Sequence, residues 1–309
     1  MVQRSLPNAG FPRGIVPSMN TPFLDDESID VQGIRRSADA VMAAGVTGML
    51  VLAVAGETGS LSLDEKRLVA SLFLEQAGGR VPVIIGCSSP QQADRVALAA
   101  MARDLGAPAM LCQIPPAASG EKLVALVQEI AAAGPGLLML QDLDFGGPGL
   151  AMADILLLHQ QIPAFQGLKI EVSMPGPKYT AVLQATQGAL HISGGWAAAQ
   201  MPEALHRGVH AFIPTAMDAI YVEVFRLFEA GKDAAARALQ ADLTPVLAFS
   251  NQHIDVSIRF FKHLRHREGL FATALCRSGV TALDAHQQRE LEINIDRVMA
   301  LQARLEQRR

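Results

Sequence analysis

Short, nearly continuous apolar runs recur along the first two-thirds of the chain, separated by longer amphipathic stretches. Parallel strands that are buried on both faces read as such runs, and amphipathic stretches of this length are typical of helices. Eight strand–helix units in succession predict an α/β fold, the (β/α)8 TIM barrel. A doubly wound sheet is the alternative, but no Gly-x-Gly-x-x-Gly motif follows an early strand. The predicted strands are 14–19, 48–53, 81–86, 109–112, 137–141, 165–170, 190–193 and 211–214.

Local signals predict where several helices begin. Ser62 with Glu65 three residues later forms a capping-box motif, and Ser89-Pro90 is typical of a cap followed by a first-turn proline. Beyond residue 213 the pattern becomes helical only, with helices expected at 218–230, 233–249, 256–267 and 286–307. We therefore expect residues 1–230 to form the barrel and residues 231–309 to form additional C-terminal helices packed on it, as one structural unit. The last helix carries one apolar stripe, at Leu291, Ile295, Val298, Leu301 and Leu305.

Composition narrows the class of protein. The chain has 309 residues, is 50% hydrophobic and carries a net charge of −4 without a basic run, so a nucleic-acid partner is not expected. No apolar segment is long enough to span a bilayer, and the N-terminus lacks a signal-peptide core. Cys87, Cys112 and Cys276 have neither metal-ligand nor disulfide-framework spacing. These features predict a cytoplasmic protein without a metal or cofactor.

Lys169 is the residue most worth explaining chemically. It is a cation within an otherwise apolar predicted strand, near its carboxyl end, where barrel enzymes place their reacting groups. Such a lysine is either an edge residue whose ammonium reaches solvent or a buried amine. Burial disfavours the charged form, and a neutral amine attacks carbonyl carbons. The local spacing does not distinguish these two readings.

Several motifs give the chain a family resemblance over nearly its whole length. They include Thr21-Pro22-Phe23, Gly56-Glu57, Gly167-Leu168-Lys169 and Ser193-Gly194, and their order and spacing are more specific than any one of them. In these features the sequence resembles the dihydrodipicolinate synthase / N-acetylneuraminate lyase family of class I, Schiff-base-forming lyases. The resemblance implies a (β/α)8 barrel with extra C-terminal helices, assembled as a homo-oligomer, a tetramer or a dimer.

The resemblance also implies roles for individual residues. Lys169 would form a Schiff base with the keto carbon of pyruvate or a related 2-oxo acid, and an aldehyde would serve as second substrate in an aldol reaction. The backbone N–H groups of Val54 and Ala55 would hold the carboxylate of the 2-oxo acid. Gln141, Gly194 and Ile213 would complete the substrate-binding residues.

This chain departs from the family pattern at several of these positions. The family's Gly-Thr-Thr-Gly-Glu loop reads Ala-Val-Ala-Gly-Glu at residues 53–57, and Gln141 stands where the family has a tyrosine. The arginine that grips a second carboxylate would align near Gly146. The two tyrosines, Tyr179 and Tyr221, fall in predicted outer helices. These differences argue against dihydrodipicolinate synthesis and against sialic acid cleavage.

The group that moves protons is therefore left open. Asp142 and Glu57 are the main candidates, with Asp144, Cys112 and a bound water as further alternatives. Ile114, Pro115 and Phe145 would make the second-substrate side of the site more apolar.

Three hypotheses follow from this pattern. The first is an active Schiff-base lyase, either an aldolase or a dehydratase, acting on a 2-oxo acid such as pyruvate or a 2-keto-3-deoxy acid. The alternative is a catalytically impaired paralogue that binds a 2-oxo acid or sugar acid as a sensor or regulatory protein. A purely structural subunit is the third. The first is favoured because packing explains an amine at position 169 less readily than a changed substrate explains the missing tyrosines.

Overall fold

Strands and helices alternate along the chain in the computed structural model, which describes residues 10–114, 118–277 and 279–307. The described residues fall into two compact units: those within 10–13, 84–195 and 203–212 form the first, and those within 14–83, 196–202 and 213–307 form the second. The alternating order confirms the predicted sequence of strands and helices. The predicted boundary between a barrel and an extension at residue 230 stays a prediction.

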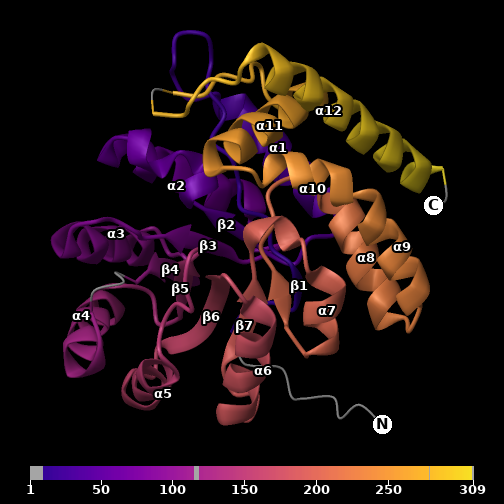
Figure 1. Cartoon of the computed structure of the whole chain (residues 1–309). Helices are drawn as coiled ribbons and strands as arrows, with labels where there is room; N and C mark the ends of the chain where they lie inside the picture. The colour runs from indigo at the N-terminus through magenta and orange to yellow at the C-terminus, as the bar shows by residue number, and fades with distance from the viewer. Residues whose placement is uncertain (1–9, 115–117, 278, 308–309) are drawn as a thin grey trace. The chain divides into compact units, whose positions relative to one another are not determined.

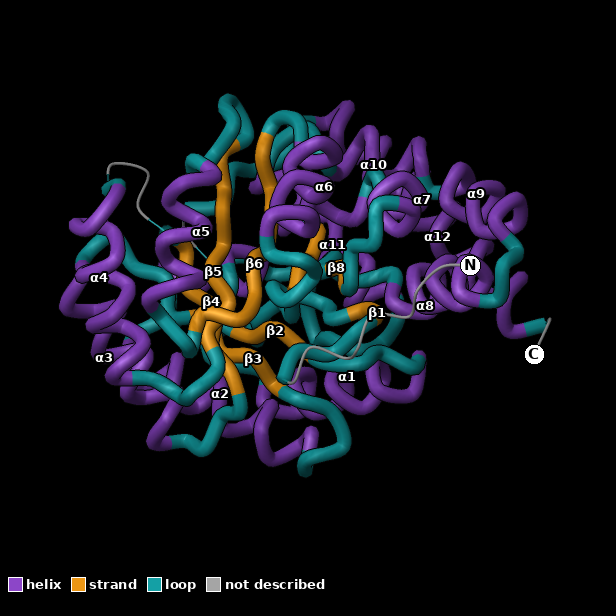
Figure 2. Tube along the Cα trace, turned by 90° about the horizontal axis from the view of Figure 1, so that it is seen from below, coloured by secondary structure: helices purple, strands orange, loops and turns teal. Residues whose placement is uncertain are grey.

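The first unit is built on parallel strands with helices between them. Strands β3 to β8 pair in chain order, each with the next. Figure 1 shows α3, α4, α5 and α6 in succession around the outside of these strands, and Figure 2 shows β4, β5 and β6 side by side. Its elements are β3 (Val83–Gly86), α3 (Gln92–Asp104), β4 (Ala109–Gln113), α4 (Gly120–Ala133), β5 (Leu138–Asp144), α5 (Met152–Gln161), β6 (Phe165–Val172), α6 (Pro175–Ala185), β7 (His191–Gly194), α7 (Met201–His206) and β8 (Ala211–Phe212).

The second unit combines two strands with most of the remaining helices. A parallel bridge between Ser18 and Leu50 joins the segments after β1 and within β2. Helix α8 packs on α9, and α12 packs on α10 and α11 (Figure 1). Its elements are β1 (Gly14–Ile15), α1 (Val31–Ala44), β2 (Met49–Val51), the 3-10 turns η1 (Val54–Gly56), η2 (Thr58–Ser60) and η3 (Trp196–Ala198), α2 (Leu63–Ala77), α8 (Asp218–Glu229), α9 (Asp233–Asp242), α10 (Thr244–Ser250), α11 (Ile254–Arg267) and α12 (Ala285–Glu306).

Local sequence signals account for much of this structure. The reciprocal bonds between Ser62 and Glu65 that begin α2 confirm the predicted capping box. The apolar stripe of α12 is buried along its whole length, as its spacing predicts. β5 and β6 run further than expected, to Asp144 and Val172, so polar residues at their carboxyl ends belong to the strands themselves.

Two predicted helices differ in the structure. The helix expected at 233–249 is two helices, because α9 ends before Leu243 and Pro245 starts the first turn of α10. Proline lacks an N–H and favours a helix start, which explains the interruption. The Ser89-Pro90 prediction is wrong: α3 begins later, with Gln91 as its N-cap. The Ser89 hydroxyl instead accepts a bond from the Gln91 N–H and forms a local turn.

Candidate active site

Strand β6 carries an amine and a carboxylate on one face. Side chains two residues apart in a strand point to the same side, which brings Lys169 and Glu171 together. Lys169 Nζ lies 2.9 Å from Glu171 Oε2, and both side chains are buried, 7% and 6% exposed. The buried reading of Lys169 is therefore the correct one, and its amine is fixed beside a carboxylate.

The neighbouring strands extend this polar face. The register of the parallel strands places Gln141 of β5 beside Lys169, and Ser193 of β7 on its other side. Gln113 of β4 lies next to Gln141 in the same row. Gln141 Nε2 donates a hydrogen bond to Glu171 Oε2 at 2.5 Å. Glu171 Oε2 therefore contacts both the Lys169 amine and the Gln141 amide.

Two glycines, the last residue of β7 and the one that follows it, leave space for this arrangement. A Cβ at Gly195 would overlap Glu171 Oε1 and would lie 2.7 Å from Lys169 Cε. A Cβ at Gly194 would lie 2.9 Å from the Tyr179 hydroxyl oxygen. Any side chain at position 195 would displace the amine or the carboxylate. The chain therefore needs glycine there for reasons of space.

Tyr179 reaches closer to the strands than an outer-helix position suggests. It lies in α6 as predicted, but its side chain is buried and its hydroxyl donates to the backbone oxygen of Ile170 at 3.4 Å. Burial raises the pKa of the Tyr179 phenol well above its ordinary value, and the negative charges of Glu171 and Glu203 raise that pKa further. The phenol therefore stays protonated.

Asp142, one of the two main candidates for proton transfer, belongs to a different environment from Gln141. It points to the opposite face of β5, as alternation requires. Its Oδ2 lies 2.5 Å from Lys178 Nζ, and its Oδ1 accepts from the backbone N–H of Leu150. Lys178 also donates to the backbone oxygens of Pro148 and Leu150. Asp142 thus holds the loop that follows β5.

Asp144 and Cys112, the other proton-transfer candidates in the first unit, also lie in environments that do not favour this role. Asp144 accepts from the N–H of Gly149, at the turn after β5. Burial raises the pKa of the Cys112 thiol to about 12, so the thiolate is disfavoured. Of the three residues expected to make the site apolar, Ile114 is buried and Phe145 is 49% exposed. Pro115 lies outside the described residues.

The second unit holds the loop after β2, with Val54, Ala55 and Glu57. Val54 and Ala55 open a 3-10 turn, and the first N–H groups of such a turn have no partner within it. Asn20 donates to the backbone oxygen of Ala55, and Thr21 donates to that of Gly56, so the loop is held from the β1 side. Ile213 belongs to the same unit and follows β8 directly.

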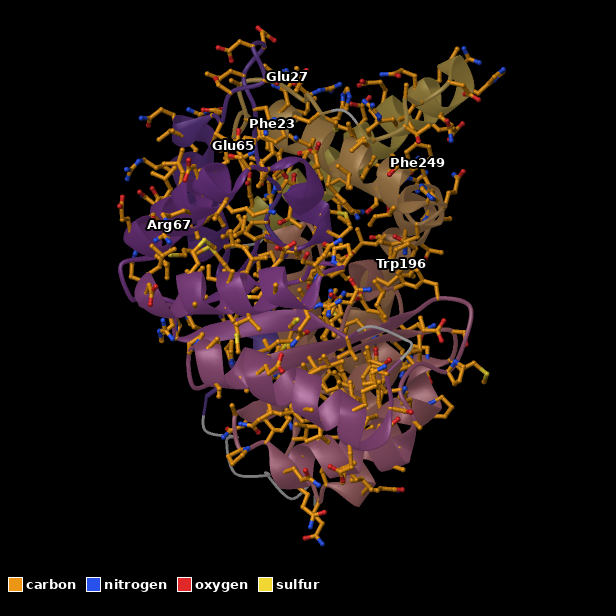
Figure 3. All side chains as sticks on the ribbon, turned by 90° about the vertical axis from the view of Figure 1, so that its left-hand side faces the viewer. Phe23, Glu27, Glu65, Arg67, Trp196 and Phe249 are labelled. Atoms are coloured by element: carbon orange, nitrogen blue, oxygen red, sulfur yellow. The ribbon has the colours of Figure 1, made fainter. Side chains whose placement is uncertain are left out.

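Glu57 is bound through both carboxylate oxygens. Its Oε1 lies 2.5 Å from Lys262 Nζ of α11, and its Oε2 accepts from the N–H of Arg277. Lys262 Nζ and the Arg277 guanidinium also lie over the ring of Phe23, 4.1 and 4.3 Å from its centre. Figure 3 labels Phe23 close to Glu65, the carboxylate that pairs with Arg277. These contacts tie the loop after β2 to the C-terminal segment.

Sequence reasoning assigned no role to Glu171 or Lys262, although each carried a signal. Glu171 lies two residues after Lys169, the spacing that puts two strand side chains on one face. Lys262 lies between Ile258 and Arg265 on the buried face of α11, and burial lowers the pKa of its amine, with Glu57 acting in the opposite direction. A charged residue at a buried helical position indicates a partner from elsewhere in the chain.

The described residues contain neither a membrane-spanning helix nor a cluster of metal-ligating side chains. No described helix has both the length and the apolar composition needed to cross a membrane. Within the same residues, no group of three or more histidine, cysteine, aspartate or glutamate side chains is arranged to hold a metal ion.

Comparison with known sequences finds one family. A model of the dihydrodipicolinate synthetase family matches residues 11–298. A 4-hydroxy-tetrahydrodipicolinate synthase of Salinibacter ruber is 34% identical over 163 residues, which cover 51% of this chain and 53% of that protein. The enzyme of the same name from Methanopyrus kandleri is 35% identical over 103 residues, covering 33% and 34%. The matched region thus spans about half, or less, of the length of these relatives.

Solved structures resemble the chain over most of its length. Dihydrodipicolinate synthase from Rhodopseudomonas palustris has a TM-score of 0.85 at 23% identity, covering 93% of this chain and 99% of that one. Sialic acid aldolase from Ruminococcus gnavus has a TM-score of 0.85 at 20% identity, covering 94% and 98%. This likeness shows the fold: a (β/α)8 TIM barrel followed by additional helices, as the sequence predicts.

Proposed function

The chain belongs to the dihydrodipicolinate synthetase family, and from that premise we propose that it is a class I lyase in which Lys169 forms a Schiff base with a 2-oxo acid. The iminium withdraws electrons from the adjacent carbon. It would thereby allow a neighbouring C–C bond to be made or broken, or water to be eliminated. The substrate class is pyruvate or a 2-keto-3-deoxy acid, with an aldehyde as partner in the aldol direction.

One observation carries this proposal: the Lys169 amine is buried in the carboxyl-terminal half of β6, 2.9 Å from a carboxylate. A lysine that served only packing would extend its ammonium towards water, because an unpaired buried charge is unfavourable. Here the amine is instead held beside a group that can accept its proton. That arrangement suits an amine that must lose a proton before it attacks a carbonyl carbon.

We further propose that the reaction differs from that named for the sequence relatives. Support comes from Gln141, which replaces the family's tyrosine and bonds to Glu171, and from the Ala-Val-Ala sequence at 53–55 that lacks the loop hydroxyls. Gly146 offers no side chain to bind a second carboxylate. Assay of 4-hydroxy-tetrahydrodipicolinate synthesis is the direct comparison, and turnover at the rate of an authentic synthase would overturn this part of the proposal.

The remaining substrate contacts are proposals that rest on the family resemblance. The N–H groups of Val54 and Ala55 would bind the carboxylate of the 2-oxo acid, supported by their place at the start of a 3-10 turn. Gln141, Gly194 and Ile213 would line the substrate. The variant Ala55→Pro removes one N–H donor and should raise the concentration of pyruvate needed for half-maximal imine formation.

Borohydride trapping tests the central claim. The protein is incubated with pyruvate, reduced with sodium borohydride and analysed by intact and peptide mass spectrometry. A reduced pyruvyl adduct on the peptide that contains Lys169, lost in Lys169→Ala, is expected. Lys122→Ala is the matched control, because Lys122 is an exposed lysine on α4 and its removal should leave the adduct unchanged. An adduct that persists in Lys169→Ala would refute the assignment.

A binding protein is the second candidate function, favoured by the absent loop hydroxyls and the replaced tyrosine. In that case titration calorimetry would detect binding of a 2-oxo acid or sugar acid, while reduction with borohydride would trap no adduct on Lys169. Detectable turnover of any tested substrate would exclude it. We propose a homo-oligomer, a tetramer or a dimer, in either case, and light scattering after size-exclusion chromatography would measure its mass.

A further inference from the structure

We propose that Glu171 is the general acid and base of the reaction, a role that rests on the Schiff-base function proposed above. Glu171 and Lys169 occupy the same face of β6, and Lys169 Nζ lies 2.9 Å from Glu171 Oε2. A proton-transfer group must lie within hydrogen-bond reach of the atom it serves. Glu171 meets that requirement for the reacting nitrogen.

Gln141 is the positioning residue for this carboxylate. Its Nε2 donates to Glu171 Oε2 at 2.5 Å from the adjacent strand β5. The other oxygen, Oε1, faces the backbone at Gly195, where a Cβ would overlap it. The carboxylate is therefore oriented by a neighbour on each side. An amide at position 141 cannot exchange a proton as a phenol does, but it can hold a carboxylate that does.

The other candidates in the first unit are less suited to this role. Asp142 is paired with Lys178 and points to the opposite face of β5. Burial raises the pKa of the Cys112 thiol, and burial with nearby negative charge raises that of the Tyr179 phenol, so neither would act readily as a base near neutral pH. Glu171 is the carboxylate that contacts the Lys169 nitrogen among the ion pairs of the described residues.

Glu171 alone can make every proton transfer that imine formation requires. Glu171 first takes a proton from the Lys169 ammonium, giving a neutral amine and a carboxylic acid. The amine attacks C2 of the 2-oxo acid; a new N–C bond forms, the C=O π bond opens, and the oxygen takes the Glu171 proton. The attacking nitrogen is now positively charged, and it gives one of its two protons to the Glu171 carboxylate. Finally the C–OH bond breaks, water leaves with that proton, and the nitrogen lone pair forms the C=N bond of the iminium.

The same carboxylate can carry out the next step. After water leaves, Glu171 is again ionised, and it removes a proton from C3 of the iminium to give the enamine. The C3–H electron pair becomes the C2=C3 double bond, and the C=N π electrons return to nitrogen. When the enamine is protonated at C3, these events reverse. In deuterated water, each cycle replaces a hydrogen of the pyruvate methyl group with deuterium.

Methyl exchange therefore separates the role of Glu171 from that of Lys169 without a second substrate. Proton NMR follows loss of the pyruvate methyl signal in deuterated buffer, and borohydride trapping on the same samples measures the imine at equilibrium. For Glu171→Gln, exchange should fall about 100-fold or more, the range typical of general acid–base catalysis. The adduct on Lys169 should still form, although more slowly. Glu121→Gln, at an exposed glutamate on α4, is the matched control and should exchange at the wild-type rate.

Two further variants show whether a carboxylate, rather than a local structural contact, is needed. Glu171→Ala in the presence of sodium formate should regain exchange with increasing formate, because the small anion can occupy the vacated space. Gln141→Leu should lose exchange about tenfold while still forming the adduct, and Gln141→Asn should recover part of that loss. If Glu171→Gln does not fold, the same criteria are applied to Glu171→Ala without formate.

The outcomes distinguish this inference from the function on which it rests. If the wild-type protein forms no adduct, the Schiff-base function and the role of Glu171 both fail. If the adduct forms on Lys169 and a folded Glu171 variant exchanges within threefold of wild type, the Schiff-base function stands and the role of Glu171 is refuted. Loss of exchange without any rescue by formate would also count against a proton-transfer role.

Discussion

Lys262 Nζ lies 2.5 Å from Glu57 Oε1 in the second unit, with both side chains almost fully buried, although the two residues are 205 positions apart in the sequence. Glu57 Oε2 also accepts from the backbone N–H of Arg277. A buried ion pair whose remaining lone pairs are occupied in this way fastens distant segments to each other. Removing one partner leaves an uncompensated charge in a site with little water.

The variant Lys262→Met should therefore lower the free energy of unfolding by about 3–5 kcal/mol, the range for breaking one side of a buried pair. Adding Glu57→Gln to it should restore part of the loss, since the buried charge is then gone. Urea unfolding followed by circular dichroism measures both. Arg237→Ala, which breaks the exposed pair with Asp233, is the control and should change stability by less than about 1 kcal/mol. An equally small effect for Lys262→Met would contradict the prediction.

A buried histidine of the first unit, His191, predicts how stability depends on pH. The rings of His191 and His210 stack with centroids 5.1 Å apart, and the Ile192 N–H donates to His210 Nδ1. Burial, followed by the neighbouring His210 and Arg13, lowers the pKa of His191 from 6.5 to about 3. In the folded protein His191 is therefore neutral across the physiological range.

The sign of the effect follows from where the proton binds. Between pH 6.5 and about 3 the unfolded chain binds a proton at His191 that the folded chain does not. The contribution of His191 to the free energy of unfolding is therefore fully present above pH 6.5 and is lost as the pH falls towards 3. Each pH unit contributes at most about 1.4 kcal/mol. The difference in unfolding free energy between wild type and His191→Phe should change with this slope. A parallel pair of curves for wild type and His191→Phe would refute the prediction.

Gly195 should prove sensitive to the smallest side chain. In Gly195→Ala the added methyl would overlap Glu171 Oε1 and crowd Lys169 Cε, separating the amine from its carboxylate. Under the proposed function we expect the rate of adduct formation with pyruvate to fall about tenfold or more, given how steeply catalysis depends on position. Gly136→Ala is the control, because nothing lies within 4 Å of its added Cβ. Equal rates of trapping in the two variants would contradict the crowding argument.

Asp142→Asn tests a proton-transfer candidate that the sequence suggests. The Asp142 carboxylate is paired with Lys178 and faces away from Gln141, so we expect methyl exchange within about threefold of wild type, below the range for loss of an acid or base. Stability should instead fall by about 3–5 kcal/mol, because the largely buried Lys178 ammonium loses its charged partner. Loss of exchange with unchanged stability would assign the proton-transfer role to Asp142.

The sequence alone determined the features that depend on local pattern. The strand–helix alternation, the capping box at Ser62 and the stripe of α12 follow from periodicity and from side-chain bonds within a few residues. The position of Lys169 in a buried strand was also readable, because apolar neighbours surround it in sequence. Where the local reading was wrong, at the break between α9 and α10, a proline within the predicted helix decided against it.

Only the tertiary structure decided which polar groups meet. Glu171 receives Gln141 because the register of β5 on β6 aligns residues 141 and 169, and a shift of one position would turn every side chain to the other face. Glu57 is held by Lys262, and Asp142 by Lys178, through contacts between distant segments. Hydrophobic periodicity indicates which face of an element is buried, whereas the partner of a buried polar side chain depends on which faces come together in the fold. For that reason Lys169, the proposed nucleophile, stood out in the sequence, whereas the contact that suggests a role for Glu171 appears only in the folded chain.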